Sequence, residues 1–165
     1  MRKIGLLAAF ALVLVLGGCT VAPTNELRTS DYHAPTPETV PGARTITTAE
    51  LAELLRKSPP PVLIDVLGGE GHATVPGATW LRGAGVGRSF DDAVQTRLVS
   101  AVNRLTENDK GRTVVVFCLN SMCWLSYNAS LRLVRAGFTD VRWYREGTEG
   151  WKTRQPTVPA VAARW

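Results

Sequence analysis

Two cysteines near the middle of the chain are the side chains best suited to covalent chemistry. Cys118 and Cys123 lie in the segment FCLNSMCWLSYN with four residues between them, and the whole chain contains three cysteines. A cysteine thiolate is a nucleophile, and two cysteines on a curled loop can reach the separation of about 5.5 to 6 Å between Cα atoms that a disulfide needs. The segment therefore indicates nucleophilic, redox or disulfide chemistry.

Cys118 is placed where a parallel sheet presents functional groups. It follows the β-branched run TVVVF at 113–117 and precedes a helical pattern over 123–136. Such a run predicts a strand buried on both faces, and functional side chains collect just past the carboxyl ends of such strands. Loop N–H groups and the positive end of the helix dipole would stabilise a thiolate there. We interpret Cys118 as the candidate nucleophile, with a buried structural cysteine as the alternative.

Three roles are open to Cys123: a disulfide with Cys118, resolution of a modified Cys118, or capping of the helix that begins there. A structural zinc site does not fit two thiols without a nearby histidine, and covalent haem attachment does not fit because no histidine follows Cys123. We expect no cofactor and no metal at these residues.

The rest of the chain alternates helical and strand patterns, which predicts an α/β fold with a mostly parallel sheet flanked by helices. Thr47 and Ser89 are the expected N-caps of the first two helices. We predict one domain over 46–165, with loops at 67–88 and 145–151 and an irregular C-terminal tail. Helices are expected at 47–57, 89–105 and 123–136, and strands at 61–66, 113–117 and 140–144.

The first residues are typical of a targeting signal. Arg2 and Lys3 precede a continuously apolar run that ends at Cys19. The sequence LGGC at 16–19 resembles the lipobox of bacterial lipoproteins, which implies a signal peptide over 1–18 and acylation of Cys19. Thr20, rather than an acidic residue, then implies delivery to the outer membrane, with the protein on the periplasmic side of the envelope.

Residues 19–45 are rich in Thr and Pro and lack periodicity, so they are predicted to form a flexible lipidated tether in which His33 is a solvated residue. Without residues 1–18, 17 basic side chains face 14 acidic ones, because Arg2 and Lys3 are lost from the 19 basic residues of the full chain. This excess of three charges, without a basic run, gives no support for nucleic-acid binding.

Four segments in this order resemble rhodanese-like domains: PVLIDV, HATVPGATWL, VVVFC opening a loop into a helix, and GFTDVRWYREGTEGW. The resemblance runs from about Ile46 to Trp151 and implies the rhodanese fold. It also implies that Cys118 accepts a sulfane sulfur as a persulfide, with loop amides stabilising the anionic sulfur. The candidate binding residues of that loop are Leu119, Asn120, Ser121, Met122 and Trp124.

Residues outside the cysteine loop are further candidates. Asp65 is expected to orient the adjacent loop by hydrogen bonds, and His72 either approaches the site or is exposed. The usual loop of the family holds an arginine where this chain has Cys123, which removes a positive fork suited to oxyanions such as thiosulfate. Arginines on neighbouring loops would replace it only if their loops reach the site; these are Arg82, Arg88 and Arg145.

The segments VPGATWLRGAGVGR, CWLSYNAS and WYREGTEGW further resemble periplasmic rhodanese-like proteins associated with pyrroloquinoline quinone (PQQ)-dependent catabolism. Those proteins carry a Cys-X-X-Cys-Trp motif, whereas four residues separate the cysteines here. Two functions follow: sulfur transfer or thiol–disulfide relay through Cys118, or a non-catalytic binding module with a structural Cys118–Cys123 disulfide. The expected partners are a small sulfur donor or acceptor or a periplasmic redox protein, and the membrane through the lipid anchor.

Overall fold

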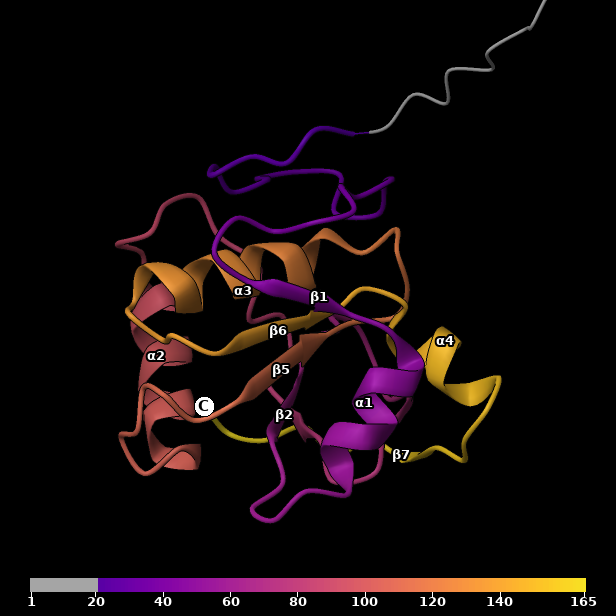
Figure 1. Cartoon of the computed structure of the whole chain (residues 1–165). Helices are drawn as coiled ribbons and strands as arrows, with labels where there is room; N and C mark the ends of the chain where they lie inside the picture. The colour runs from indigo at the N-terminus through magenta and orange to yellow at the C-terminus, as the bar shows by residue number, and fades with distance from the viewer. Residues whose placement is uncertain (1–20) are drawn as a thin grey trace, which may run out of the picture.

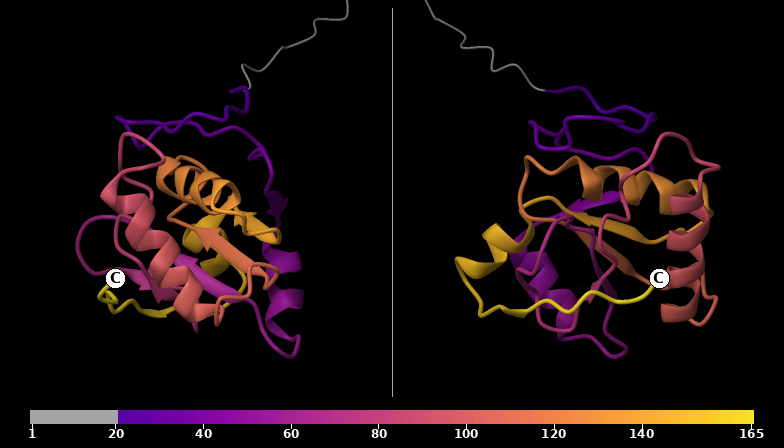
Figure 2. Two further views of the ribbon diagram at one scale, coloured as in Figure 1. Left: turned by 90° about the vertical axis from the view of Figure 1, so that its left-hand side faces the viewer. Right: turned by 180° about the vertical axis from the view of Figure 1, so that it is seen from behind.

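The computed structural model describes residues 21–165 and is built on a five-stranded parallel sheet with the strand order β1-β6-β5-β2-β4 (Figure 1). The predicted α/β class and mostly parallel sheet are confirmed, because helices cover both faces of this sheet (Figure 2). The strands of the sheet are β1 (Arg44–Ile46), β2 (Val62–Asp65), β4 (Thr79–Trp80), β5 (Val114–Phe117) and β6 (Val141–Tyr144). The helices are α1 (Thr48–Leu55), α2 (Ala93–Leu105), α3 (Trp124–Arg135) and α4 (Gly147–Lys152).

Strand β5 shows why the sheet is buried on both faces. Val114 and Val116 pack in a cluster with α2 and α3, whereas Val115 and Phe117 pack in a second cluster with α1 and α4. All four side chains are fully buried. Burial of each such side chain stabilises the fold by about 1.5 to 3 kcal/mol, so the strand that leads into Cys118 is firmly held.

The N-cap residue predicted from the sequence is the one observed for α1 but not for α2. Thr47 caps α1 in a capping box with Glu50, as predicted. The prediction of Ser89 as the cap of α2 is wrong, since Asp92 is the N-cap and its carboxylate accepts the N–H of Gln95 at 2.9 Å. An Asp that is also bound to a buried arginine is a better-anchored cap than an exposed serine.

That arginine is Arg132 on α3, whose side chain is fully buried. Its Nη2 lies 2.9 Å from the Asp92 carboxylate, and its guanidinium also donates to the backbone carbonyls of Val86 and Ser89. The ion pair and these hydrogen bonds hold the end of the loop between β4 and α2 against α3.

The predicted flexible tether over 19–45 is corrected for the residues that the structure describes. The segment 21–43, which we call the N-terminal arm, lies along α3 (Figures 1 and 2), and residues 44–45 belong to the edge strand β1. Thr24 N donates to Tyr127 Oη at 2.8 Å, and Arg28 N donates to Asn128 Oδ1 at 3.0 Å. Polar side chains on the outer face of α3 thus take up the backbone groups of the arm, which its Thr- and Pro-rich composition does not reveal.

The chain after β6 also contains more regular structure than predicted. The loop expected at 145–151 includes most of helix α4, and the irregular tail forms β7 (Val158–Pro159), which pairs with β3 (Ala73–Thr74). A bridge between Ala162 and Trp80 then lays the tail along the edge of the sheet beyond β4. Among residues 21–165, no helix is long and apolar enough to cross a membrane.

Candidate functional site

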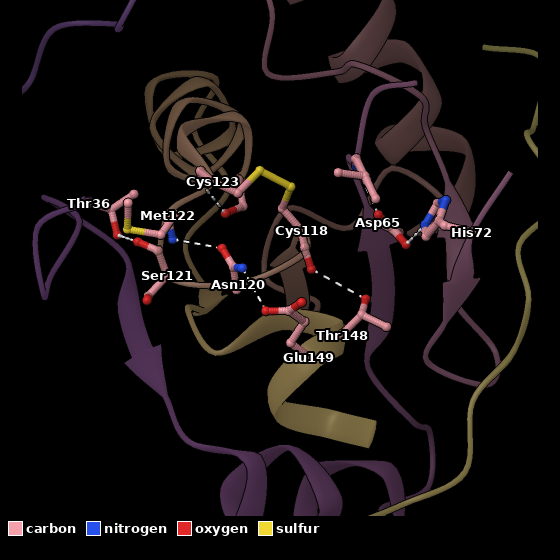
Figure 3. The surroundings of a disulfide bond; sticks show 12 residues. Thr36, Asp65, His72, Cys118, Asn120, Ser121, Met122, Cys123, Thr148 and Glu149 are labelled. Carbon is pink, nitrogen blue, oxygen red and sulfur yellow. Dashed lines mark hydrogen bonds and ion pairs between the residues drawn. A yellow bond between two sulfur atoms is a disulfide. The ribbon is translucent and has the colours of Figure 1, made fainter. Parts of the chain in front are cut away.

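The two cysteines form a disulfide at the carboxyl end of β5 (Figure 3). Cys118 follows the strand directly, Cys123 is the N-cap of α3, and their Cα atoms are 6.1 Å apart. The residues are 1% and 6% exposed, respectively. The strand-to-helix placement of Cys118 agrees with the sequence interpretation. Of the three roles open to Cys123, the structure shows the disulfide; Cys123 also stands at the N-cap position of α3, but its side chain makes no capping hydrogen bond.

Helix α4 holds the first half of the cysteine loop from one side (Figure 3). Thr148 N donates to Cys118 O at 3.0 Å, and Glu149 N donates to Leu119 O at 2.9 Å. The Glu149 carboxylate accepts the Asn120 side-chain amide at 2.7 Å. Gly147 has φ +60°, and a Cβ there would lie 2.4 Å from Cys118 O, so only glycine permits this approach.

The N-terminal arm holds the second half of the loop from the opposite side. Thr36 donates to Ser121 O from its N at 3.2 Å and from its Oγ1 at 2.6 Å, and Ala34 N donates to Met122 O at 2.9 Å. Arg145, at the end of β6, fixes the arm in turn by donating to Thr36 and to Pro37 O. The loop is therefore clamped between a segment that precedes the sheet and a helix that follows it.

This clamp leaves donors within the loop available. The loop's own Asn120 takes up two of its N–H groups, since Asn120 Oδ1 accepts Met122 N at 2.9 Å and Asn120 O accepts Cys123 N at 3.1 Å. Within the described chain, the N–H groups of Leu119, Asn120 and Ser121 have no hydrogen-bond acceptor. Successive free N–H groups beside a helix N-terminus can cradle an anion, such as a thiolate or an ionised persulfide.

Asp65 ends β2 beside the cysteine loop and is fully buried. Its Oδ1 accepts the Leu67 N–H at 2.9 Å, and its Oδ2 accepts the Thr74 hydroxyl at 2.6 Å and contacts His72 Nε2 at 2.7 Å. These contacts give Asp65 the loop-orienting position expected for it. His72 lies largely inside, with its ring edge-on to Trp80 at 4.6 Å between centroids, so it braces Asp65.

The arginines do not replace the positive fork that the loop lacks. Arg82 is about half exposed and its nearest acidic partner is Glu70, at 3.4 Å. Arg88 is exposed, and Arg145 is committed to the arm. Within the described part of the chain, no hydrogen bond or ion pair joins any of the three to residues 118–124. None of the three arginines is therefore fixed at the loop by a hydrogen bond or ion pair of its own in the described chain.

Three further observations concern the site and its surroundings. In residues 21–165, no three His, Cys, Asp or Glu side chains gather to form a metal site. Trp124 lies at the start of α3 with its Nε1 donating to Pro35 O of the arm, so it serves as the platform on which the arm rests. Burial raises the pKa of Tyr127, which keeps its hydroxyl a neutral donor to Thr24 O.

Sequence reasoning missed the two segments that clamp the loop. Thr36 and His33 fell in the predicted tether, and Thr148 and Glu149 fell in a predicted loop. The one local signal was Gly147, which is the first residue of the short helix α4. The lipidation candidate Cys19 lies outside the described residues.

A family model described as rhodanese-like domain matches residues 47–154. Comparison with curated proteins gives no significant match. A thiosulfate sulfurtransferase from Pseudomonas aeruginosa superposes with a TM-score of 0.53 at 22% identity, covering 74% of this chain and 21% of the other. An EanB variant in complex with hercynine gives a TM-score of 0.54 at 15% identity, covering 78% and 34%. A protein from Bacillus halodurans gives 0.50 at 18% identity, covering 70% and 77%. The chain thus spans only about a fifth of the first of these proteins, and these likenesses show the fold.

Proposed function

Because the chain belongs to the family of rhodanese-like domains, we propose that Cys118 accepts a sulfane sulfur and that Cys123 resolves the resulting persulfide as part of a thiol relay. The observation that carries this proposal is the Cys118–Cys123 bond itself. It places a second sulfur within bonding distance of the residue that the family resemblance identifies as the sulfur acceptor.

The proposed relay has three steps: sulfur uptake, disulfide formation and reduction. In the reduced protein the Cys118 thiolate attacks the sulfane sulfur of a polysulfide or a similar donor, and the donor leaves one sulfur shorter. The Cys123 thiolate then attacks the Cys118 sulfur, the disulfide forms, and the outer sulfur leaves as hydrosulfide. An external thiol reductant restores both thiols and is itself oxidised. The unbonded N–H groups of the loop support the anionic persulfide.

Thiosulfate is a poor fit as the donor. The loop has no arginine, and the arginines of the neighbouring loops are exposed or bound elsewhere, so a doubly charged oxyanion would find no bidentate partner. We therefore expect sulfane donors without an oxyanion group, such as polysulfide, to react faster with the reduced protein than thiosulfate does.

Mass spectrometry of the reduced chain tests the proposed function. After treatment with polysulfide, the Cys118 peptide is expected to gain one sulfur, and this species should decay to the Cys118–Cys123 disulfide as hydrosulfide is released. A disulfide that resists thiol reductants under native conditions, together with no added sulfur on either cysteine from any donor, would rule the relay out.

One observation favours a second function, a rhodanese-shaped binding module with a structural disulfide. Both cysteines are almost fully buried, and the loop is clamped from two sides. A bond in that position would staple the loop for recognition of a partner. The same reduction experiment separates the two functions, because a structural staple reduces only when the domain unfolds.

We propose further that Cys19 is acylated and holds the protein to the outer membrane on its periplasmic side. The support is the LGGC sequence at 16–19. Since the arm binds the domain from Thr24 onward, the anchored domain would lie close to the bilayer rather than at the end of a long tether.

Replacing Cys19 with alanine should leave the expressed protein either soluble or unprocessed, with its signal uncut, because the acylated thiol is lost. Fractionation of cells into soluble and membrane material measures this, with Cys118→Ala as a control that keeps the anchor. Normal signal cleavage with unchanged attachment in Cys19→Ala would contradict the lipid anchor.

The resemblance to proteins of PQQ-dependent catabolism leads us to propose a periplasmic redox protein of such a system as the relay's partner. The measurement is the activity of PQQ-dependent dehydrogenases in membranes from a strain that lacks this protein. Activity equal to that of the parent strain would contradict the proposed association with a PQQ-dependent system and would leave the proposed thiol relay unchanged.

A further inference from the structure

The N-terminal arm brings one of the chain's two histidines next to the cysteine pair. An isolated antiparallel bridge pairs His33 with Cys123. Hydrogen bonds flank it on both sides, from Ala34 N to Met122 O and from Trp124 N to Tyr32 O, each at 2.9 Å. In this pattern the two opposed residues form a non-hydrogen-bonded pair, with Cα atoms about 4.5 Å apart and side chains on the same face.

The packing of the neighbouring arm residues agrees with this direction. Tyr32 and Ala34 pack against the aromatic cluster that contains Trp124. Because side chains alternate along an extended segment, His33 faces the opposite way, toward the side of Cys123. The His33 side chain is exposed, and within residues 21–165 its ring makes no hydrogen bond or ion pair. Its ring nitrogens are therefore available to exchange a proton.

Cys123 carries the thiol whose proton the His33 imidazole could accept. It is the N-cap of the twelve-residue helix α3, and it makes no side-chain capping hydrogen bond while it is held in the disulfide. Once reduced, a thiolate at that position would be stabilised by the first N–H groups of the helix.

The other charged groups around Cys123 have fixed partners. Arg28 lies over the Trp124 ring at 5.0 Å, Arg145 binds the arm, and Glu149 binds Asn120. On the side of Cys118, Asp65 is paired with His72. Among these side chains, His33 is the one without a partner in the described chain, and an imidazole is a common proton acceptor for a thiol.

We propose that His33 is the proton acceptor for the Cys123 thiol, so that an arm outside the matched family domain completes the relay site. This rests on the proposed function. The Cys123 thiol gives its proton to the imidazole, and the resulting thiolate attacks the Cys118 sulfur of the persulfide. The disulfide forms, and the departing outer sulfur of the anionic persulfide takes the proton from the imidazolium and leaves as hydrosulfide. The sulfane sulfur is reduced and the two cysteine sulfurs are oxidised.

The test is the rate at which iodoacetamide alkylates each cysteine of the reduced full chain as a function of pH. At about pH 6, where imidazole is largely protonated, His33→Gln is expected to slow alkylation of Cys123 about fivefold relative to the wild type. The difference should vanish at about pH 8.5, where the imidazole is neutral.

The alkylation rate of Cys118 in the same samples and the variant Glu38→Gln, elsewhere on the exposed arm, are the controls. Coincident pH profiles for Cys123 in wild type and His33→Gln would overturn the assignment, as would an equal change in Glu38→Gln. Because alkylation uses no sulfur donor, it is independent of the polysulfide experiment. A changed Cys123 profile, combined with no added sulfur on Cys118 in that separate experiment, would support the role of His33 while rejecting the relay.

Discussion

Replacing Cys118 with serine is expected to abolish sulfur uptake by the protein, with a loss of about a thousandfold or more in the rate of persulfide formation. A serine hydroxyl at this position has no general base beside it, and the loop's free N–H groups stabilise an anion only after a nucleophile has attacked. The rate of persulfide formation is measured by quenching the reaction of the reduced protein with polysulfide at successive times and analysing each sample by mass spectrometry.

Cys123→Ser is the matched variant, because it removes the other half of the same disulfide. It should take up sulfur on Cys118 at a rate close to that of the wild type but keep the persulfide much longer, since no internal thiolate displaces it. Both variants lose the disulfide. If they lose the same amount of stability, a difference in sulfur uptake between them cannot come from unfolding. Equal sulfur uptake in Cys118→Ser and Cys123→Ser would contradict the assignment of Cys118 as acceptor.

Replacing Asp92 with asparagine is expected to reduce the free energy of unfolding by about 3 to 5 kcal/mol. Arg132 is fully buried, and Asp92 is the residue that balances its charge. Asparagine caps helices about as well as aspartate, so the cap on Gln95 should survive and the loss reports the ion pair. Urea denaturation measures this loss in the free energy of unfolding, and because urea is uncharged it does not screen the ion pair as a salt would.

The same pair makes stability depend on acidity. Burial of the Asp92 carboxyl raises its pKa, but hydrogen bonds, with Arg132 the strongest contributor, outweigh this and lower the pKa to about 2. A depressed pKa stabilises the fold above the unfolded value of 3.8, and this stabilisation is lost as pH falls toward 2. The wild type should lose about 2 kcal/mol over that range through Asp92, and Asp92→Asn should not lose this part.

Asp140→Asn provides a control for both measurements. The pair of Asp140 with Arg142 is partly exposed, at 30% and 20%, so its loss should cost about 1 kcal/mol or less. A loss in Asp92→Asn no larger than that in Asp140→Asn would show that the buried pair contributes little.

Local sequence signals predicted the elements that lead into the site. The run at 113–117 is β-branched and buried on both faces, so it forms a central strand in any α/β packing. The helical spacing after Cys123 predicted α3 to within one residue at each end, and Thr47 with Glu50 predicted the start of α1. Each of these signals is contained within about a turn or a strand, where propensity and periodicity act.

The errors arose where distant residues supply the partners. Asp92 rather than Ser89 caps α2 because Arg132, forty residues later, holds its carboxylate. The arm departs from its predicted flexibility because Tyr127 and Asn128, a hundred residues away, bind its backbone. Composition cannot indicate a segment whose order comes from another element's side chains.

The sequence by itself therefore determined the α/β fold, the strand that ends at Cys118 and the helix that begins after Cys123, because β-branched runs, helical periodicity and caps are local. Only the tertiary structure decided what surrounds the two sulfurs. Helix α4 and the N-terminal arm are brought to the loop from opposite ends of the chain, and their hydrogen bonds to its carbonyls leave its N–H groups free. The pairing of His33 with Cys123 follows from that same docking, which depends on contacts that no nearby residue encodes.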